Sequence, residues 1–421
     1  MSAQAPATLA AADAETPAFA DGELHVRLVS TATDWHHALW DERGALRHPL
    51  KDTGFLQALE HAYPERRCRY VEVRRGEQVV AQFLLNEDVL DSTMFASPRV
   101  KAAVGWVRRI VPGFLRIRVA TVGTMDTSGA HWWHEAGAVE PDAFCRVVQR
   151  AAKAAFPRAH LLLFRDVLDS DPVSGALAHQ FESAGFRRVQ GLPIASVRSH
   201  GDAGAHYASL NRKVRAFIRK MPGLAAEHGL RLEVAARPLD HLEEAYALFL
   251  NVSRRAKEVQ REPVPLEFFR QLLRLPGCRM TVARGSSGQM VGFILTRVTA
   301  GVASPAYIGL DYTVSDGARL YHQLLWSEIA TCLDAGAGEV DLGLTSYFVK
   351  QGFGAVLDGS VMLARFQQAM VHRLLGGLIP HLLHIEQPAA RRKRPGVPAP
   401  TDVNADAGTP AVESRQEPAE A

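Results

Sequence analysis

Residues 307–354 read YIGLDYTVSDGARLYHQLLWSEIATCLDAGAGEVDLGLTSYFVKQGFG, and this stretch decides the fold of the chain. It begins with the end of an apolar strand, after which residues 320–334 carry apolar side chains at helical spacing. A short apolar strand at 339–342 follows, and it leads into a short helix that carries Tyr347 and Lys350. The pattern therefore predicts a strand, a helix, a second strand and a second helix in succession.

The segments before this run predict helices followed by an antiparallel meander. Tight turns at Gly285–Gly288 and at Ala300-Gly301 separate the expected strands. Helix pair, meander, helix and strand together describe a domain in which helices flank a mixed, mainly antiparallel sheet. The expected helices cover 207–227, 239–258 and 266–275, and the expected strands cover 230–235, 279–283, 290–298 and 302–310.

The N-terminal half repeats this order of elements with different residues. A hairpin turning at Gly76 is expected, and so is an amphipathic helix at 142–155 with Pro141 in its first turn. The fold class is therefore α/β (α+β), with two tandem domains of similar construction. The domain limits expected from the pattern are 23–200 and 201–386, with segments 1–22 and 387–421 disordered because their Ala-, Pro- and acid-rich composition cannot form a core.

Composition and charge exclude several classes of function. The 421 residues are 47% hydrophobic and carry a net charge of only +3, so no general DNA-binding surface is expected. Four scattered cysteines without a CxxC pair indicate reduced thiols, and the N-terminus does not resemble a signal peptide. We therefore expect a cytoplasmic protein without an integral membrane segment and without a metal site, since the histidine pairs lack further ligands. The basic run at 391–394 could contact anionic lipid or RNA, or could simply be a solvated tail.

Three motifs carry a family resemblance. They are Gly309-Leu-Asp-Tyr312 at a strand end, the helix that begins Leu320-Tyr321, and the D-x-G-x-T-x-Y-x-x-K-x-x-x-G segment at 341–354. With the basic helix YASLNRKVRAFIRK at 207–220, they resemble the Fem/BioF-like branch of the GNAT acyltransferase superfamily, the type linked to peptidoglycan and cellulose biosynthesis. The resemblance implies two tandem GNAT-like domains and transfer of an acyl group, with a functional lysine at the position of Lys350.

A thioester donor requires a cradle for its phosphates. Residues Ser315, Asp316, Gly317, Ala318 and Arg319 are expected to connect a strand to a helix N-terminus, where backbone N–H groups stabilise phosphate. Arg319 would add a charge-assisted contact. The segment lacks the glycine-rich loop of typical GNAT enzymes, and Ser315 and Asp316 could instead simply cap the helix.

Three residues are candidates for the chemistry itself. Asp311 at the strand end is a candidate general base, although aspartate is also common at strand ends. Tyr347 and Lys350 lie three apart and share a helix face, so Lys350 could stabilise a developing oxyanion or pair with an anionic substrate group. A solvated lysine is the alternative for Lys350.

A basic stripe and one aromatic residue are candidates for substrate binding. Arg212 and Arg215 lie on one face of the expected helix at 207–227, and Tyr312 follows the candidate base. These residues suit an anionic acceptor, while a merely solvated basic face is the alternative.

The interpretation is an N-acyltransferase that moves an acyl group from an acyl thioester, acyl-CoA or acetyl-CoA, to a small-molecule or carrier-linked amine by direct attack. No permanently bound cofactor is expected. One alternative is a Fem-like transferase that uses aminoacyl-tRNA to modify a cell-wall precursor. The other is a non-catalytic GNAT-fold binding module.

Overall fold

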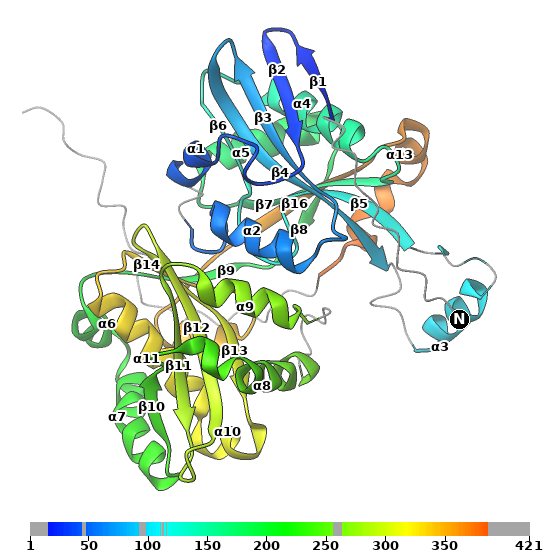
Figure 1. Ribbon diagram of the computed structural model, residues 1–421. Helices are drawn as coiled ribbons and strands as arrows, with labels where there is room; N and C mark the ends of the chain where they lie inside the picture. Colours follow the sequence, from blue (N-terminus) through cyan, green and yellow to red (C-terminus); the bar gives the residue numbers. More distant parts are fainter. Residues whose placement is uncertain are drawn as a thin grey trace, which may run out of the picture. The chain divides into compact units, whose positions relative to one another are not determined.

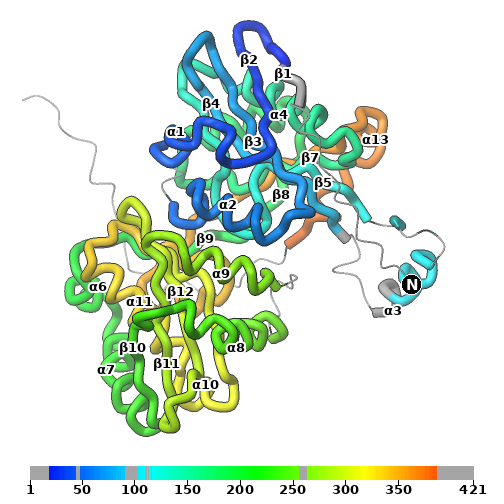
Figure 2. The backbone as a smooth tube through the Cα atoms, viewed as in Figure 1, coloured from blue at the N-terminus to red at the C-terminus, as the bar shows by residue number. Residues whose placement is uncertain are grey.

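The computed structural model describes residues 16–43, 48–91, 98–109, 111, 113–114, 116–255 and 263–385. Its strands form two mixed sheets with helices on their faces, here called sheet A and sheet B (Figures 1 and 2). This architecture confirms the predicted fold class.

Sheet A is antiparallel except where β5 pairs in parallel with β7. Its strand order is β1-β2-β3-β4-β5-β7-β16-β8, with β6 paired to β4. The β3–β4 hairpin turns at Gly76, whose φ of +56° suits glycine, as predicted. The strands are β1 (Thr16–Asp21), β2 (Leu24–Val29), β3 (Cys68–Arg75), β4 (Gln78–Asp91), β5 (Arg116–Val122), β6 (Trp132–His134), β7 (Leu161–Leu168), β8 (Arg187–Gln190) and β16 (Ser360–Phe366).

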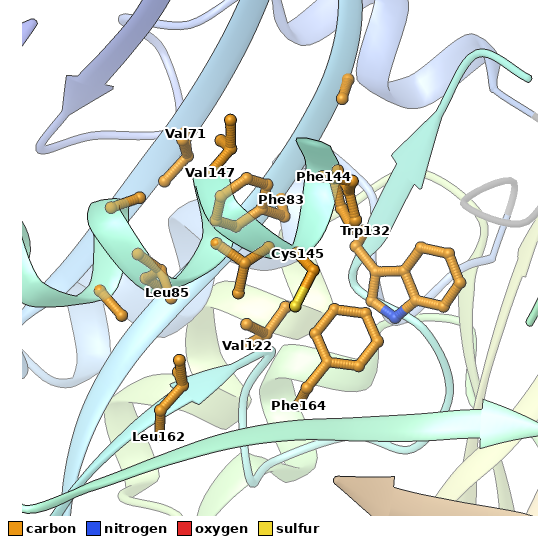
Figure 3. Close-up of a cluster of buried hydrophobic side chains, with 14 of the residues drawn as sticks. Val71, Phe83, Leu85, Val122, Trp132, Phe144, Cys145, Val147, Leu162 and Phe164 are labelled. Atoms are coloured by element: carbon orange, nitrogen blue, oxygen red, sulfur yellow. The ribbon is translucent and has the colours of Figure 1, made fainter. Parts of the chain in front are cut away.

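The core of the N-terminal half lies between sheet A and the predicted amphipathic helix, which spans Pro141–Ala155 and is α4. Its buried face carries Phe144, Val147 and Val148 onto the strands, where Phe83 and Phe164 meet them (Figure 3). Each such side chain contributes about 1.5–3 kcal/mol on burial. The other helices of this half are α1 (His37–Glu42), α2 (Thr53–Ala62), α3 (Pro98–Arg108) and α5 (Pro172–Ser183).

Sheet B contains the predicted meander. Its strand order is β10-β11-β12-β13-β14-β9-β15, and only β13 and β14 pair in parallel. The turn at Ala300-Gly301 has two positive φ values, 50° and 83°, as a tight hairpin turn requires. The strands are β9 (Ile194–Arg198), β10 (Arg231–Val234), β11 (Cys278–Arg284), β12 (Met290–Thr299), β13 (Val302–Leu310), β14 (Glu339–Gly343) and β15 (Val356–Asp358).

Helices cover sheet B on both faces. The predicted helix at 320–334 is α11 (Leu320–Asp334), and Leu320, Leu324 and Ile329 on it are fully buried. The predicted helix at 207–227 is instead two helices, because Leu210 is extended and Asn211 caps a new helix through the N–H of Val214. The remaining helices are α6 (Ala203–Ser209), α7 (Arg212–Glu227), η2 (Pro238–His241), α8 (Leu242–Arg255), α9 (Leu266–Arg274), α10 (Tyr312–Ala318) and α12 (Tyr347–Gly352).

The two halves of the chain exchange strands. β9 precedes the predicted domain limit at residue 200 but lies in sheet B, between β14 and β15. β16 follows that limit but lies in sheet A, between β7 and β8 (Figure 1). After β16 the chain continues over sheet A as α13 (Ala369–Leu375), η3 (Gly376–Leu378) and α14 (Ile379–Leu382). Each half therefore completes the sheet of the other.

The prediction of disorder at 1–22 is wrong for its last residues. Residues 16–21 form β1, which pairs antiparallel with β2. Phe19 packs against the core, and the Arg150 guanidinium lies over its ring. The carboxylate of Asp21 forms ion pairs with Arg146 and Arg150 on α4. These contacts order a segment whose composition gives no strand signal. Residues 1–15 and the predicted disordered tail at 387–421 lie outside the described residues.

Candidate functional site

The parallel strands β13 and β14 separate soon after they meet. They pair only through Val302 with Glu339 and Ala303 with Val340, although β13 continues to Leu310. Within the described part of the chain, no strand pairs with the rest of β13 on this side. β13 therefore continues for several residues beyond its pairing with β14, and the two strands leave an opening there.

A β-bulge lies at the point of separation. On the other side of β13, Leu295 of β12 faces Tyr307 while Thr296 faces Pro305, so Ala306 is an extra residue. Residues 306–308 are half-buried, whereas the residues on either side of them are buried. Because a bulge turns the backbone and Pro305 has no N–H, a ligand at this opening would meet peptide donors from the part of β13 that follows Pro305. Fixed peptide donors of this kind can stabilise an oxyanion.

Helix α8 lies directly against this part of β13. A Cβ at Gly309 would come within 2.7 Å of the Phe249 nitrogen, so glycine is needed for the helix to approach. The Asn251 side-chain amide also donates to the Leu310 carbonyl at 3.4 Å. The opening between β13 and β14 is therefore held by a rigid contact on one side.

The segment after β13 differs from the predicted phosphate loop. Residues 312–318 form helix α10, and the residue that caps its N-terminus is Asp311, not Ser315 or Asp316. Asp311 Oδ1 accepts from the Thr313 N–H at 2.9 Å and from the Thr313 hydroxyl at 2.7 Å. The expected cradle of outward amides at Gly317 and Ala318 is wrong, because these residues lie inside a helical turn that Asp311 starts by capping it. Ser315 and Ala318 are buried.

Other predicted residues of this segment gather around Arg255 at the end of α8. Its guanidinium lies 4.1 Å from the ring centroid of Tyr312 and 3.5 Å from an Asp316 carboxylate oxygen. Arg319 is exposed and separates α10 from α11 with a left-handed φ of 54°. Arg255 was not among the predicted site residues, because its neighbours here are distant in sequence.

The predicted basic stripe on α7 is partly occupied by internal contacts. The Arg215 guanidinium donates to the Ala208 carbonyl at 2.7 Å, and Arg219 donates to the Tyr207 hydroxyl at 3.0 Å. Arg212 is exposed in the first turn of α7. No hydrogen bond or ion pair among the described residues joins Arg212 or Arg215 to β13 or α10, so their substrate-binding role stays a prediction.

Tyr347 and Lys350 share one face of α12, as their spacing predicted. The Lys350 Nζ lies 6.0 Å from the centroid of the Tyr347 ring. Both residues are buried: Tyr347 donates to the Pro193 carbonyl at 2.8 Å, and the Lys350 ammonium donates to the Leu344 carbonyl. The turn that Lys350 bonds contains Thr345, whose φ is 63°. The structure thus gives Lys350 a contact that holds the end of β14, and its catalytic role stays a prediction.

A buried polar cluster, which sequence analysis missed, lies where the C-terminal ends of β7 and β14 face the segment before α2. His48 Nε2 lies 2.6 Å from Asp341 Oδ2, and the Leu50 N–H donates to His48 Nδ1 at 3.2 Å. The proton is thus placed on Nε2, which donates to the carboxylate. This junction cluster comprises His48, Lys51, His131, Arg165, Asp166 and Asp341.

The charges in the junction cluster shift one another's protonation. Burial lowers the pKa of Lys51, an effect that the carboxylates of Asp341 and Asp166 oppose. Burial alone would raise the pKa of Asp341, but hydrogen bonds from His48 and Gly343 hold that pKa below its ordinary value. Burial, with Lys51 and Arg165 nearby, places the pKa of His131 well below its ordinary value. Charged residues of the two halves of the chain therefore interact with one another in this cluster.

Few signals in the sequence could have revealed this cluster. Asp341 begins one of the motifs that carry the resemblance, but nothing near His48 or Lys51 in RHPLKDTG marks either residue as buried. Among the described residues, no group of three or more His, Cys, Asp and Glu side chains could hold a metal ion. Within the same part of the chain, no helix combines the length and apolar content needed to cross a bilayer.

A meander whose last strand carries a bulge and separates from a parallel neighbour defines an acyltransferase fold of the GNAT kind. Residues 208–351 match the family model of the acetyltransferase (GNAT) domain. The matched residues belong to the GNAT superfamily, and the fold of the chain is Fem-like.

Comparison with solved structures supports this fold. FemX superimposes with a TM-score of 0.54 over 82% of this chain and 98% of FemX, at 12% sequence identity. A tandem GNAT protein from the clavulanic acid biosynthesis pathway gives a TM-score of 0.46 at 16% identity, covering 82% of this chain and 99% of that protein. L-PGS from Bacillus licheniformis gives 0.44 at 13% identity, covering 78% of this chain and 97% of L-PGS. No curated protein matches the chain in sequence.

Proposed function

We propose that the chain is an N-acyltransferase that moves an acyl group from an acyl thioester, acyl-CoA, to an amine by direct attack. The observation that carries this proposal is the opening between β13 and β14, with its bulge at Ala306. An extended thioester arm can lie along β13 beyond its pairing with β14, and its carbonyl oxygen can then accept a hydrogen bond from a peptide N–H of β13 that follows Pro305.

In the proposed reaction the amine nitrogen attacks the thioester carbon. The C–N bond forms and the C–S bond breaks, while the oxyanion between these steps is stabilised by the β13 amides. A base takes a proton from the amine, and the departing thiolate takes up a proton to leave as the thiol. No covalent intermediate with the enzyme is required.

Asp311 is the proposed base. It follows the last residue of β13 and is half-buried, so it lies at the end of the strand along which the donor would bind. Both of its hydrogen bonds end on Oδ1, and among the described residues none ends on Oδ2. The cap on α10 therefore fixes the carboxylate while its second oxygen can accept a proton directly or through water.

The donor's phosphates are proposed to bind at side chains, because the segment offers no glycine-rich loop. Arg319 and Arg255 both lie beside α10, and guanidinium groups bind phosphate through charge-assisted hydrogen bonds. Of the five residues expected to bind the donor, Arg319 is exposed and cationic and carries this part of the proposal. The donor, together with four cysteines that are free thiols, fits a cytoplasmic compartment.

The acceptor is proposed to be a small or carrier-linked amine. One observation favours a second candidate, a transferase that uses aminoacyl-tRNA on a cell-wall precursor, namely the similarity of the fold to FemX. The two candidates differ in the donor and share the opening at β13.

The test measures thiol release from acyl-CoA with a panel of amines. Asp311→Asn keeps an oxygen that can cap α10, so the fold should survive while turnover falls about 10²- to 10⁴-fold. Asp240→Asn changes an exposed carboxylate on η2, away from β13 and α10, and is the matched control that should leave turnover within a few-fold. An unchanged rate in the Asp311 variant would remove it as the base. Turnover only with aminoacyl-tRNA would establish the second candidate, and no turnover with either donor would indicate a binding module.

A further inference from the structure

The C-terminal helical segment carries an apolar stripe on its outer face. Met370 and Leu374 on α13, Leu378 on η3 and Leu382 on α14 form this stripe and are 77%, 74%, 50% and 39% exposed. Ile379 on the same segment is buried against sheet A. The segment is therefore anchored by one face while its other face offers large apolar side chains to the surroundings, which is the sign of an interaction surface.

An apolar cavity lies beside the stripe. It has a volume of about 270 Å³ and is lined by Arg116, Ile117, His160, Phe366, Gln368 and Val371. A second, smaller hollow shares Ile117 and Phe366 with it and continues to Leu382 and Leu383. The apolar surface thus extends from the helices down to β5.

Three arginines lie around this surface, and Asp91 is the ladder partner of one of them, Arg116. Arg373 lies on α13 and Arg116 lines the cavity. Arg187 lies on β8, close to Val189, which packs with Ile379 of α14. All three arginines are exposed, and among the described residues none has an ion pair with a carboxylate. In the sequence, the run Arg391-Arg392-Lys393-Arg394 begins nine residues after Leu382.

We propose that this face, the stripe with its surrounding arginines, docks on an anionic lipid membrane. An apolar stripe flanked by cations is the pattern with which helices lie in the plane of a membrane interface, their apolar side chains among the acyl chains and their cations at the phosphates. Acyl chains can also enter the apolar cavity beside Arg116. The proposal goes beyond the acyl transfer proposed above and does not rest on it.

The charges favour a membrane over a second copy of the chain. In a symmetric dimer through this face, the arginines of one copy would face those of the other, and such like-charge contacts are costly. An anionic bilayer instead offers a phosphate to every arginine. Basic residues next to an anionic surface add attraction one by one, so the run at 391–394 would strengthen the same contact.

The test is co-sedimentation of the full chain with vesicles. We expect binding to vesicles of phosphatidylcholine with phosphatidylglycerol, and much weaker binding to phosphatidylcholine alone. Met370→Ser with Leu374→Ser should weaken binding roughly 100-fold, about ten-fold for each side chain. Val234→Ser removes a comparably exposed apolar side chain, 57% exposed, from β10 and should leave binding unchanged.

The charge contribution is tested separately. Arg373→Gln should weaken binding to the anionic vesicles about five-fold, and glutamine at all four positions of 391–394 should weaken it by several such factors. Circular dichroism of each variant checks that the fold is retained. The proposal fails if the native chain does not sediment with anionic vesicles, or if Val234→Ser loses as much binding as the stripe variant. It also fails if the stripe instead holds a dimer that the Met370→Ser, Leu374→Ser variant dissociates, or binds RNA in place of lipid.

Discussion

Arg297 and Asp52 join the two halves of the chain through a buried ion pair. The guanidinium of Arg297, on β12, makes two parallel hydrogen bonds of 2.7 Å to the carboxylate of Asp52, the residue that caps α2. It also donates to the Pro49 carbonyl. The Arg297 side chain is 4% exposed and that of Asp52 13%, so water screens this pair little.

Replacing Arg297 by Met tests how much this pair contributes. The change leaves the Asp52 carboxylate and the Pro49 carbonyl without their partner in a buried setting, a situation that costs about 3–5 kcal/mol. Asp52→Asn keeps an acceptor for the cap and one bond to Arg297, so it should cost less, about 2 kcal/mol. Once Arg297 is gone, the Asn change should cost little, which gives a coupling energy near 2 kcal/mol in a double-mutant cycle.

Urea unfolding followed by circular dichroism measures all four proteins of this cycle. Arg188→Met is the matched control, since its pair with Glu182 is exposed and should contribute no more than about 1 kcal/mol. A loss below about 1 kcal/mol in Arg297→Met, or a coupling energy of zero, would refute the conclusion that this pair stabilises the protein.

Three further expectations follow from single positions. Gly309→Ala should destabilise the protein by about 1–3 kcal/mol, because the added Cβ would meet the backbone of α8. Gly223→Ala lies in the interior of α7 with nothing within 4 Å of the added Cβ, so it should stabilise the protein by up to about 1 kcal/mol. Thermal unfolding compares the two variants, and equal effects would contradict the close packing at Gly309. Because the pKa of His131 is lowered in the folded protein, below about pH 6.5 the unfolded chain binds a proton at this residue that the folded chain does not bind. The free energy of unfolding should therefore fall by up to about 1.4 kcal/mol per pH unit as the pH decreases. In denaturant titrations His131→Asn should flatten this pH dependence, whereas the control variant His381→Asn, at an exposed position, should leave it unchanged. Lys350→Met should cost about 1.5–3 kcal/mol by leaving the Leu344 carbonyl unbonded, and a variant that loses activity at full stability would instead favour direct catalysis by Lys350.

Local periodicity was enough to predict most of the elements. The helix at 320–334 has the predicted limits, and the hairpin at Gly76 and the meander from β11 to β13 lie where turn residues and apolar runs placed them. These features depend on neighbours within a few residues, and such neighbours are visible in the sequence. The missed strand β1 shows the limit, because its order comes from pairing with β2 and from contacts with α4.

The candidate site was predictable only in part. The position of Asp311 at the end of β13, and the shared face of Tyr347 and Lys350, followed from spacing. Helix α10 was missed because the capping residue is Asp311 itself, whereas Ser315 and Asp316 further on offered an equally good cap in the sequence. The bulge at Ala306 left no signal, since it is a matter of register between β12 and β13.

The sequence by itself determined the order of helices and strands and the motifs of the GNAT superfamily, because these depend on short-range spacing. Only the tertiary structure decided which sheet receives β9 and β16, because a strand can pair with any free edge that its side chains fit, and that edge lies far away in the chain. The same is true of the junction cluster. His48 and Lys51, Asp166, and Asp341 come from three separate segments, and only the packing of the two halves removes them from water and makes their charges depend on one another.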